Sequence, residues 1–267
     1  IRRQKMKLTY GNQTIDLLSE KLFKTVPKKI VVSLSGGLDS SSLTYLIATY
    51  FPDVEIYPFH SKDKDGPLDT ECALNVHRYL KGMFPQIKDL RIFEVNTSDP
   101  VWLKRAQEEL DDPIKGKING VPRWGNVRGG SKALQNRRAR WTMHKEHSTV
   151  VCMAMSMNPP VDVMKERGFY NVAERKRDPG RSDEKQVDYG TYMPYLYVDK
   201  RFVAGVYEEH GLMKELYPMT KSCAWGPESG NTNYPDPCGR CFWCNEKGWA
   251  FGVVNDPFQG TSIEGRD

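Results

Sequence analysis

A short apolar run that ends in a Ser/Gly turn is the feature that most constrains the fold of this chain of 267 residues. Residues 30–32 are Ile-Val-Val, which is typical of a buried strand, and residues 33–40 read SLSGGLDS. A helical pattern of apolar residues begins at Asp39. The segment therefore predicts a strand, a tight turn and a helix N-terminus. Free backbone N–H groups and the positive end of the helix dipole favour a bound phosphate at such a terminus.

The residues of the turn discriminate between types of phosphate-binding loop. Gly36 and Gly37 lack a Cβ atom, so that backbone and anion can approach closely. The kinase-type loop needs Lys followed by Ser or Thr, and no lysine lies between positions 30 and 51. The dinucleotide fingerprint needs three spaced glycines, whereas this turn has two adjacent ones. A Ser/Gly turn without any ligand is the simplest alternative.

Residues 35–40 match the SGGxDS signature of the PP-loop ATP pyrophosphatases, the family that this chain resembles. The resemblance implies an adenine nucleotide alpha hydrolase-like, Rossmann-like fold. It also implies that ATP is cleaved between its α and β phosphates, that a carboxyl or carbonyl oxygen is adenylated, and that diphosphate sits in this loop. The predicted ligands of ATP and diphosphate are Leu34, Ser35, Gly36, Gly37, Leu38, Asp39, Ser40 and Ser41.

Asp39 and Ser40 are the predicted catalytic residues of this loop. A carboxylate does not contact phosphate directly, so Asp39 is predicted to hold Mg²⁺, which bridges the phosphates. Capping of the helix is the alternative role for Asp39. The hydroxyl of Ser40 and the backbone N–H groups nearby are predicted to stabilise the charge that develops on the leaving diphosphate.

Strand and helix patterns alternate from residue 30 to residue 110. After the first unit, strands are expected at 54–59 and 90–95, with helices at 68–84 and 101–110. This order predicts right-handed βαβ units and a doubly wound parallel sheet of the α/β class. The first strand-to-helix turn then lies at the carboxyl edge of the sheet, where ligands of open α/β folds bind. Later elements are expected at 131–147 (helix), 149–155 (strand) and 199–210 (helix).

Four of the six cysteines lie close together near the C-terminal end. Cys223, Cys238, Cys241 and Cys244 have the spacing C-x14-C-x2-C-x2-C, which predicts a closed tetrahedral site for a structural Zn²⁺ ion. An iron–sulfur cluster is the main alternative, because the same short gaps open bacterial ferredoxin runs. Those runs continue with three residues and Cys-Pro, whereas residues 245–248 here are Asn-Glu-Lys-Gly. Disulfides or free thiols are the remaining alternative.

The residues around these cysteines resemble one branch of the PP-loop family, the 7-cyano-7-deazaguanine synthases. The resemblance lies in residues 220–223 (TKSC) and 237–244 (PCGRCFWC). It implies a ligase that adenylates 7-carboxy-7-deazaguanine and uses ammonia to form the amide and then the nitrile, with release of AMP and diphosphate. ATP, Mg²⁺ and a structural Zn²⁺ are the implied cofactors.

The middle of the chain departs from this branch. Where the branch has Gly-Arg-Asn at the head of a helix, residues 134–138 here are Leu-Gln-Asn-Arg-Arg. Arg137 and Arg138 are candidates for binding diphosphate or a substrate carboxylate, since a guanidinium matches an oxyanion in shape and charge. His60, just past the second strand, is a candidate for lining the adenine or substrate pocket.

The expected division of the chain follows these motifs. Residues 1–29 are an N-terminal arm or hairpin, and 30–211 the nucleotide-binding domain. Within that domain, residues 156–190 lack periodicity and are expected to be a flap over the site. Residues 212–256 form the zinc lobe and 257–267 a tail.

The net charge of +5 is modest, so a nucleic-acid partner is not required. No apolar stretch approaches 18 residues, so no membrane span and a cytoplasmic location are expected. The expected partners are a deazapurine carboxylate and ammonia, and a homodimer stays open. Two other functions also stay open: a PP-loop enzyme that thiolates or amidates tRNA, and a nucleotide-binding module without turnover.

Overall fold

The computed structural model describes residues 6–18, 23, 25–62, 67–94, 117–118, 121–122, 130–169, 191–223 and 237–252. The elements of the first half are β1 (Met6–Tyr10), β2 (Gln13–Leu17), β3 (Lys29–Ser33), α1 (Leu38–Tyr50), β4 (Glu55–Lys62), α2 (Pro67–Met83) and β5 (Arg91–Glu94). Those of the second half are β6 (Lys117–Ile118), β7 (Val121–Pro122), α4 (Gly130–His147), β8 (Val151–Cys152), α5 (Val161–Glu166), β9 (Thr191–Tyr192), α7 (Lys200–Glu209), η3 (Tyr217–Met219) and α8 (Phe242–Phe251).

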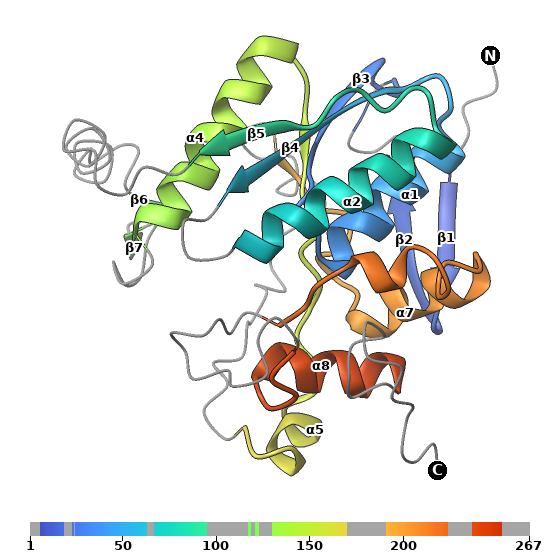
Figure 1. Ribbon diagram of the computed structural model, residues 1–267, viewed down its shortest axis with the longest axis vertical. Coiled ribbons are helices and arrows are strands. Elements are labelled where there is room, and N and C mark those ends of the chain that lie inside the picture. Colours follow the sequence, from blue (N-terminus) through green and yellow to red (C-terminus); the bar gives the residue numbers. More distant parts are fainter. Residues whose placement is uncertain are drawn as a thin grey trace.

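A five-stranded parallel sheet in the order β5-β4-β3-β8-β9 organises the fold (Figure 1). From β3 the chain proceeds outward to β4 and β5, and it later returns to the other side of β3 with β8 and β9. The direction of winding therefore reverses between β3 and β8. The fold is an α/β doubly wound parallel sheet, as the sequence predicts, and the turn after β3 lies at its switch point, where ligands of such sheets bind.

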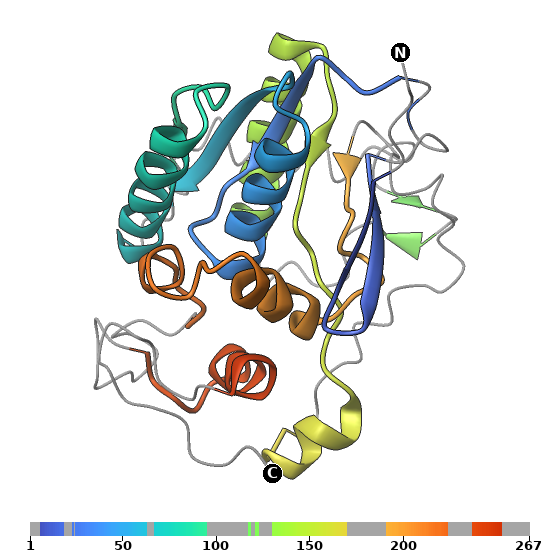
Figure 2. The ribbon, with the colours of Figure 1, turned by 90° about the vertical axis from the view of Figure 1, so that its right-hand side faces the viewer.

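Alternate residues of β3 face two different helical layers. Ile30 and Val32 join the large core that α1, α2 and α7 complete, while Val31 packs with Ala139 and Met143 of α4. This alternation follows from the two-residue period of a strand. Ile30, Val31 and Val32 are fully buried because both faces of β3 are covered by helices, as is usual in a parallel sheet. Figures 1 and 2 show α1 and α2 on one side of the sheet and α4 on the other.

The N-terminal hairpin and the C-terminal helix both pack against α7. β1 and β2 pair antiparallel around Gly11 and Asn12, which both have positive φ. A Cβ atom on Gly205 of α7 would lie 2.8 Å from the backbone nitrogen of Gly11, so this glycine lets the hairpin approach the helix. In both views, α7 lies between the sheet domain and α8 (Figures 1 and 2).

The structure differs from the sequence-based expectations at two strands. The strand expected at 149–155 is confined to Val151–Cys152. Beyond it, Met153 still donates a backbone hydrogen bond to Tyr192, but the chain then leaves the sheet, and Ser156 contacts Asp39 in the first turn of α1 instead. The other difference is β9, which the sequence pattern does not indicate, since its two residues are too few for a periodic signal.

Several expected elements lie wholly or partly outside the described residues. The helix expected at 101–110 lies there, as do residues 170–190 of the expected flap; the described part of that segment contains α5. The division of the chain into domains therefore stays a prediction. Within the part of the chain that the structure describes, no helix combines the length and apolar character needed to cross a membrane.

Candidate functional site

The turn between β3 and α1 is built on the conformational freedom of Gly36. This residue has φ +78°, in the left-handed region that side chains disfavour. A Cβ atom there would lie 2.5 Å from the backbone nitrogen of Ala73 and 2.9 Å from the carbonyl oxygen of Asp69. Gly36 therefore allows both the sharp turn and the close approach of the turn to α2.

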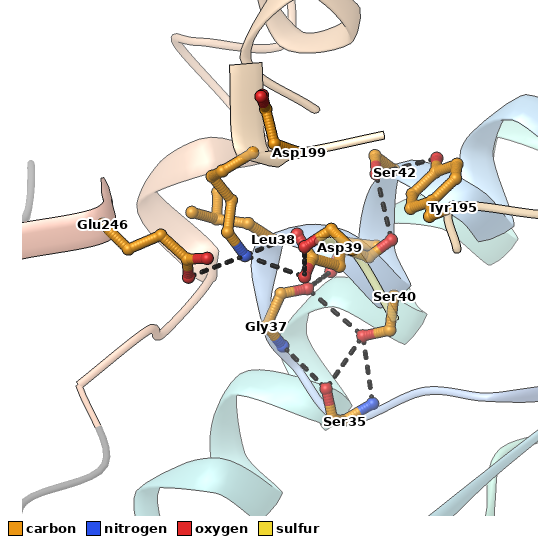
Figure 3. Close-up of polar contacts among 12 residues, drawn as sticks. Ser35, Gly37, Leu38, Asp39, Ser40, Ser42, Tyr195, Asp199 and Glu246 are labelled. Atoms are coloured by element: carbon orange, nitrogen blue, oxygen red, sulfur yellow. Dashed lines mark hydrogen bonds and ion pairs between the residues drawn. The ribbon is translucent and has the colours of Figure 1, made fainter. Parts of the chain in front are cut away.

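Hydrogen bonds among Ser35, Gly37 and Ser40 hold the turn against the N-terminus of α1 (Figure 3). The backbone N–H of Ser35 donates to Oγ of Ser40 at 3.1 Å, and the two hydroxyl oxygens lie 3.0 Å apart. The backbone N–H of Gly37 donates to Oγ of Ser35 at 3.3 Å. Gly37 is the N-cap of α1 and has no side chain with which to cap it. The first N–H groups of α1 have no partner within the helix, which makes this end suited to an anion.

The next serines of α1 bind to the protein itself. Ser41 is buried, and its hydroxyl donates to the carbonyl oxygen of Gly37 at 2.8 Å. The hydroxyl of Ser42 donates to the carbonyl oxygen of Asp39 at 2.9 Å and lies 3.0 Å from the hydroxyl of Tyr195. These bonds use the serine hydroxyls to hold the first turn of α1 in place.

Asp39 lies in the first turn of α1 and is bound by two other elements. Lys200, the first residue of α7, donates to both carboxylate oxygens, at 2.6 and 2.7 Å. The hydroxyl of Ser156 donates to Oδ2 at 3.1 Å. Asp39 thus joins α1 to α7 and to the segment that follows β8.

Lys200 lies between two carboxylates in a nearly buried position. Its Nζ atom is also 3.5 Å from Oε2 of Glu246 on α8, and its side chain is only 9% exposed. Burial alone would lower the pKa of Lys200, but attraction by Asp39 and Glu246 outweighs it, so the pKa lies above its usual value. Lys200 is therefore a fixed positive charge beside the turn.

His60 supports the turn from the neighbouring strand. It is buried, its Nδ1 atom is 3.1 Å from the carbonyl oxygen of Leu34, and its Nε2 atom is 3.1 Å from Oγ1 of Thr70. A carbonyl oxygen only accepts, so Nδ1 is the nitrogen that donates. The structure thus places His60 beneath the loop; its expected role in lining a pocket stays a prediction.

The two predicted arginines are only partly described. Arg137 and Arg138 lie in α4, but their side chains lie outside the described residues. Arg140 on the same helix is described: its Nε donates to the carbonyl oxygen of Asn136 at 3.1 Å, and its Nη1 lies 3.0 Å from the sulfur of Met153. The substrate role of Arg137 and Arg138 therefore stays a prediction.

The four clustered cysteines are placed so that they could hold one metal ion. Their sulfur atoms all lie within 4.8 Å of one another, and none of the four is in a disulfide. Cys223, Cys241 and Cys244 are buried, and Cys238 is partly exposed. Hydrogen bonding with Cys223 raises the pKa of both Cys241 and Cys244. Binding of a metal ion must therefore displace protons from these thiols.

Helix α8 begins inside the cysteine cluster. Cys241 is its N-cap and Cys244 lies in its first turn, so the positive end of the helix dipole faces the sulfur atoms. Two backbone groups add to this: the N–H of Cys238 donates to the sulfur of Cys223 at 3.4 Å, and that of Cys241 to the sulfur of Cys238 at 3.2 Å. Both features favour thiolates, the form that binds metal.

Lys200 and Glu246 were not among the residues predicted from the sequence. A lysine in the first turn of a helix opposes the helix dipole, so Lys200 directly after the N-cap Asp199 was a detectable anomaly. Glu246 gave no comparable signal, because an acidic residue in a polar stretch ordinarily faces solvent.

No family model matches the sequence, and no curated protein matches it either. Among solved structures, the chain is similar to the U34-tRNA thiolase NcsA from Methanococcus maripaludis with its [4Fe-4S] cluster, with 12% identity and a TM-score of 0.43. The match covers 72% of this chain but only 62% of the thiolase. A likeness this distant says nothing of what this chain binds or does.

Proposed function

We propose that this protein is an ATP-dependent adenylating enzyme of the PP-loop type, in which residues 34–41 bind the diphosphate part of ATP. The observation that carries the proposal is the SGGLDS turn, which lies between β3 and α1 at the switch point of a parallel sheet. Its Gly36 has the positive φ that the turn requires, and the uncapped N-terminus of α1 supplies backbone donors. Lys200 adds a positive charge beside them.

The chemistry of ATP cleavage explains why these groups are needed. Negative charge accumulates on the leaving diphosphate, and donors that are already in place stabilise it without reorganisation. Backbone N–H groups of residues 38–40 and the ammonium of Lys200 are the donors in this arrangement. Asp39 is the residue of the loop that would hold Mg²⁺, which neutralises phosphate charge when bound. Asp39 must then exchange its bonds with Lys200 for the ion.

The proposed substrate is 7-carboxy-7-deazaguanine, with ammonia as the nucleophile and the nitrile as the final product. This part rests on the resemblance of residues 220–223 and 237–244 to the 7-cyano-7-deazaguanine synthases. A closed site made from all four cysteines would agree with it, because such a site leaves no cysteine of the cluster free to carry sulfur. The other two cysteines, Cys72 and Cys152, are buried as well.

We propose that the cysteine site holds one Zn²⁺ ion. A tetrahedral site with Zn–S distances of about 2.3 Å has sulfur–sulfur edges of about 3.8 Å. The sulfur atoms of Cys241 and Cys244 are 3.4 Å apart, and those of Cys238 and Cys244 are 4.0 Å apart. The two distances from Cys223, to Cys238 and Cys241, are 3.6 and 3.9 Å. An iron–sulfur cluster separates its cysteine sulfurs more widely, since they bind different irons.

The test is to incubate the purified protein with ATP, Mg²⁺, ammonia and 7-carboxy-7-deazaguanine, and to identify the products by mass spectrometry. We expect AMP, diphosphate and the nitrile, and we expect Asp39→Ala to abolish all three while the protein stays folded. AMP formation only with tRNA and a sulfur or nitrogen donor would identify a tRNA-modifying enzyme instead. ATP binding without AMP formation, with any acid or with tRNA, would identify a nucleotide-binding module.

A further inference from the structure

The cysteine cluster and the phosphate-binding loop are connected at two places, one on each side of the cluster. Shortly before Cys223, the backbone N–H of Lys221 donates a 3.0 Å hydrogen bond to the carbonyl oxygen of Gly36. Shortly after Cys244, Glu246 reaches Lys200, with Oε2 and Nζ 3.5 Å apart. Lys200 in turn binds Asp39 of the loop. Both sides of the cluster thus contact the turn or its immediate partner.

The Glu246 side of this connection passes through buried charges. The side chains of Lys200 and Glu246 are 9% and 7% exposed, and that of Asp39 is 20% exposed. One ammonium is shared by these two carboxylates in a place where little water can screen the charges. The position of the ammonium therefore depends on both carboxylates. A movement of Glu246 therefore changes how strongly the ammonium of Lys200 is held at Asp39.

The position of Glu246 depends in turn on the cysteine cluster. Glu246 lies near the start of α8, whose N-cap is Cys241 and whose first turn contains Cys244. A metal ion on these two sulfurs holds the end of the helix that carries Glu246. Metal binding and local folding are coupled at such sites. Figure 3 shows Glu246 approaching the loop from the side opposite to Ser42 and Tyr195.

We propose that the metal ion at the cysteine cluster and ATP at the loop bind cooperatively, and that Glu246 is the positioning residue that couples them through Lys200. The inference rests on the proposed function, because it needs ATP to bind at residues 34–41. An incoming phosphate must draw Lys200 away from Asp39. Glu246 keeps the ammonium at the loop during that exchange. Coupling between two binding sites is reciprocal, so each ligand must strengthen the binding of the other.

The first test measures the dissociation constant of fluorescent mant-ATP for the zinc-loaded and the chelator-treated protein. We compare the wild type, Glu246→Gln, and Glu166→Gln as a matched control, because Glu166 is exposed on α5. Removal of zinc should weaken the binding of mant-ATP at least about fivefold in the wild type and in the control. A fivefold change is about the lower end of typical coupling between two sites. In Glu246→Gln, the change should fall below about twofold. If Glu246→Gln only weakened ATP binding equally with and without zinc, the ratio of the two dissociation constants would stay as in the wild type.

The second test uses only the folded, zinc-loaded proteins and measures the rate of zinc release to a colorimetric chelator. ATP should slow the release in the wild type and in Glu166→Gln, and leave it unchanged in Glu246→Gln. Equal slowing in Glu246→Gln would overturn the role of Glu246, as would a Glu246→Gln protein that cannot retain zinc. If the zinc-loaded wild type does not bind mant-ATP at all, the proposed function fails instead.

Discussion

The backbone N–H of Lys221 donates a 3.0 Å hydrogen bond to the carbonyl oxygen of Gly36, although the two residues are far apart in the sequence. The side chain of Lys221 also forms an ion pair with Asp69 of α2, with 3.3 Å between Nζ and Oδ1. The turn at Gly36 is thus held from the side of the cysteine cluster and from the side of α2. Its shape therefore depends on contacts with residues that are distant in sequence.

We expect Gly36→Ala to lower the free energy of unfolding by at least about 2 kcal/mol, because the positive φ alone costs roughly 1–3 kcal/mol in a residue with a side chain. The new methyl group would also meet the backbone of Ala73. Urea unfolding measures the effect, and the same variant should lose mant-ATP binding.

Alanine substitutions at two other glycines separate the cost of backbone strain at Gly36 from the cost of the steric clash with α2. Gly168 has φ +85° and Gly82 lies in α2, and a Cβ atom would meet nothing within 4 Å at either position. Gly168→Ala should show the cost of strain alone. Gly82→Ala should stabilise the helix by roughly 0.5–1 kcal/mol. If Gly36→Ala costs no more than Gly168→Ala, the contact with α2 is unimportant.

Lys200→Met should destabilise the protein by about 3 kcal/mol, because it leaves two carboxylates in a poorly solvated place without their shared cation. Since Asp39 and Glu246 then repel each other, adding Asp39→Asn and Glu246→Gln to this variant should recover part of the loss. Lys165→Met, at an exposed position of α5, is the control and should change stability little. An Lys200→Met protein as stable as this control would contradict the buried ion-pair arrangement.

Asp199 should make the stability of the protein depend on pH. It caps α7 by accepting from the backbone N–H of Arg201 at 2.9 Å, and Nε2 of Gln13 donates to it at 2.7 Å. Burial would raise its pKa, but the bonds from Arg201 and Gln13 outweigh burial and lower the pKa below the usual 3.8. The carboxylate therefore contributes stability above about pH 4, and this contribution is lost as the pH falls through the lowered pKa.

The measurement is the difference in unfolding free energy between the wild type and Asp199→Asn at several pH values. The wild type should be more stable at pH 7, and the difference should shrink as the pH falls below 3.8. Asp162→Asn, at an exposed position of α5, is the control and should show a small difference throughout. If the difference in unfolding free energy between the wild type and Asp199→Asn stayed constant down to about pH 2, Asp199 would not be the source of the pH dependence.

Cys241→Ser should lose the metal ion and unfold at a lower temperature, because the sulfur is one of the four ligands and metal binding is coupled to folding. Elemental analysis and thermal unfolding test this. Cys72→Ala is the control, since Cys72 lies outside the cluster and should leave the metal content unchanged. A Cys241→Ser protein without metal but with unchanged stability would show that the cluster is not structural.

Much of the fold follows from local sequence. The apolar run at residues 30–32 and the amphipathic helices at 68–84 and 199–210 are periodic enough to predict their elements within a few residues. The alternation of strands and helices then predicts the parallel sheet. The turn at Gly36 is also a local feature, because two glycines and three serines within seven residues leave few other conformations.

Two short strands and the partners of Asp39 depend on long-range contacts. β8 and β9 are two-residue strands, formed by pairing with residues far away in the sequence, and so short a segment carries no period of its own. The partners of Asp39 were unpredictable for a similar reason. Lys200 and Ser156 belong to elements whose distance from α1 is set by packing and not by spacing in the chain.

The sequence by itself determined the parallel α/β sheet, the glycine turn after its central strand and the four cysteines that can bind one ion, because each of these depends on neighbouring residues. Only the tertiary structure decided that Lys200 binds Asp39, and that Glu246 brings the cysteine cluster into contact with the loop. Buried charges need partners of opposite sign, but the sequence does not say which ones the packing of the helices brings within reach.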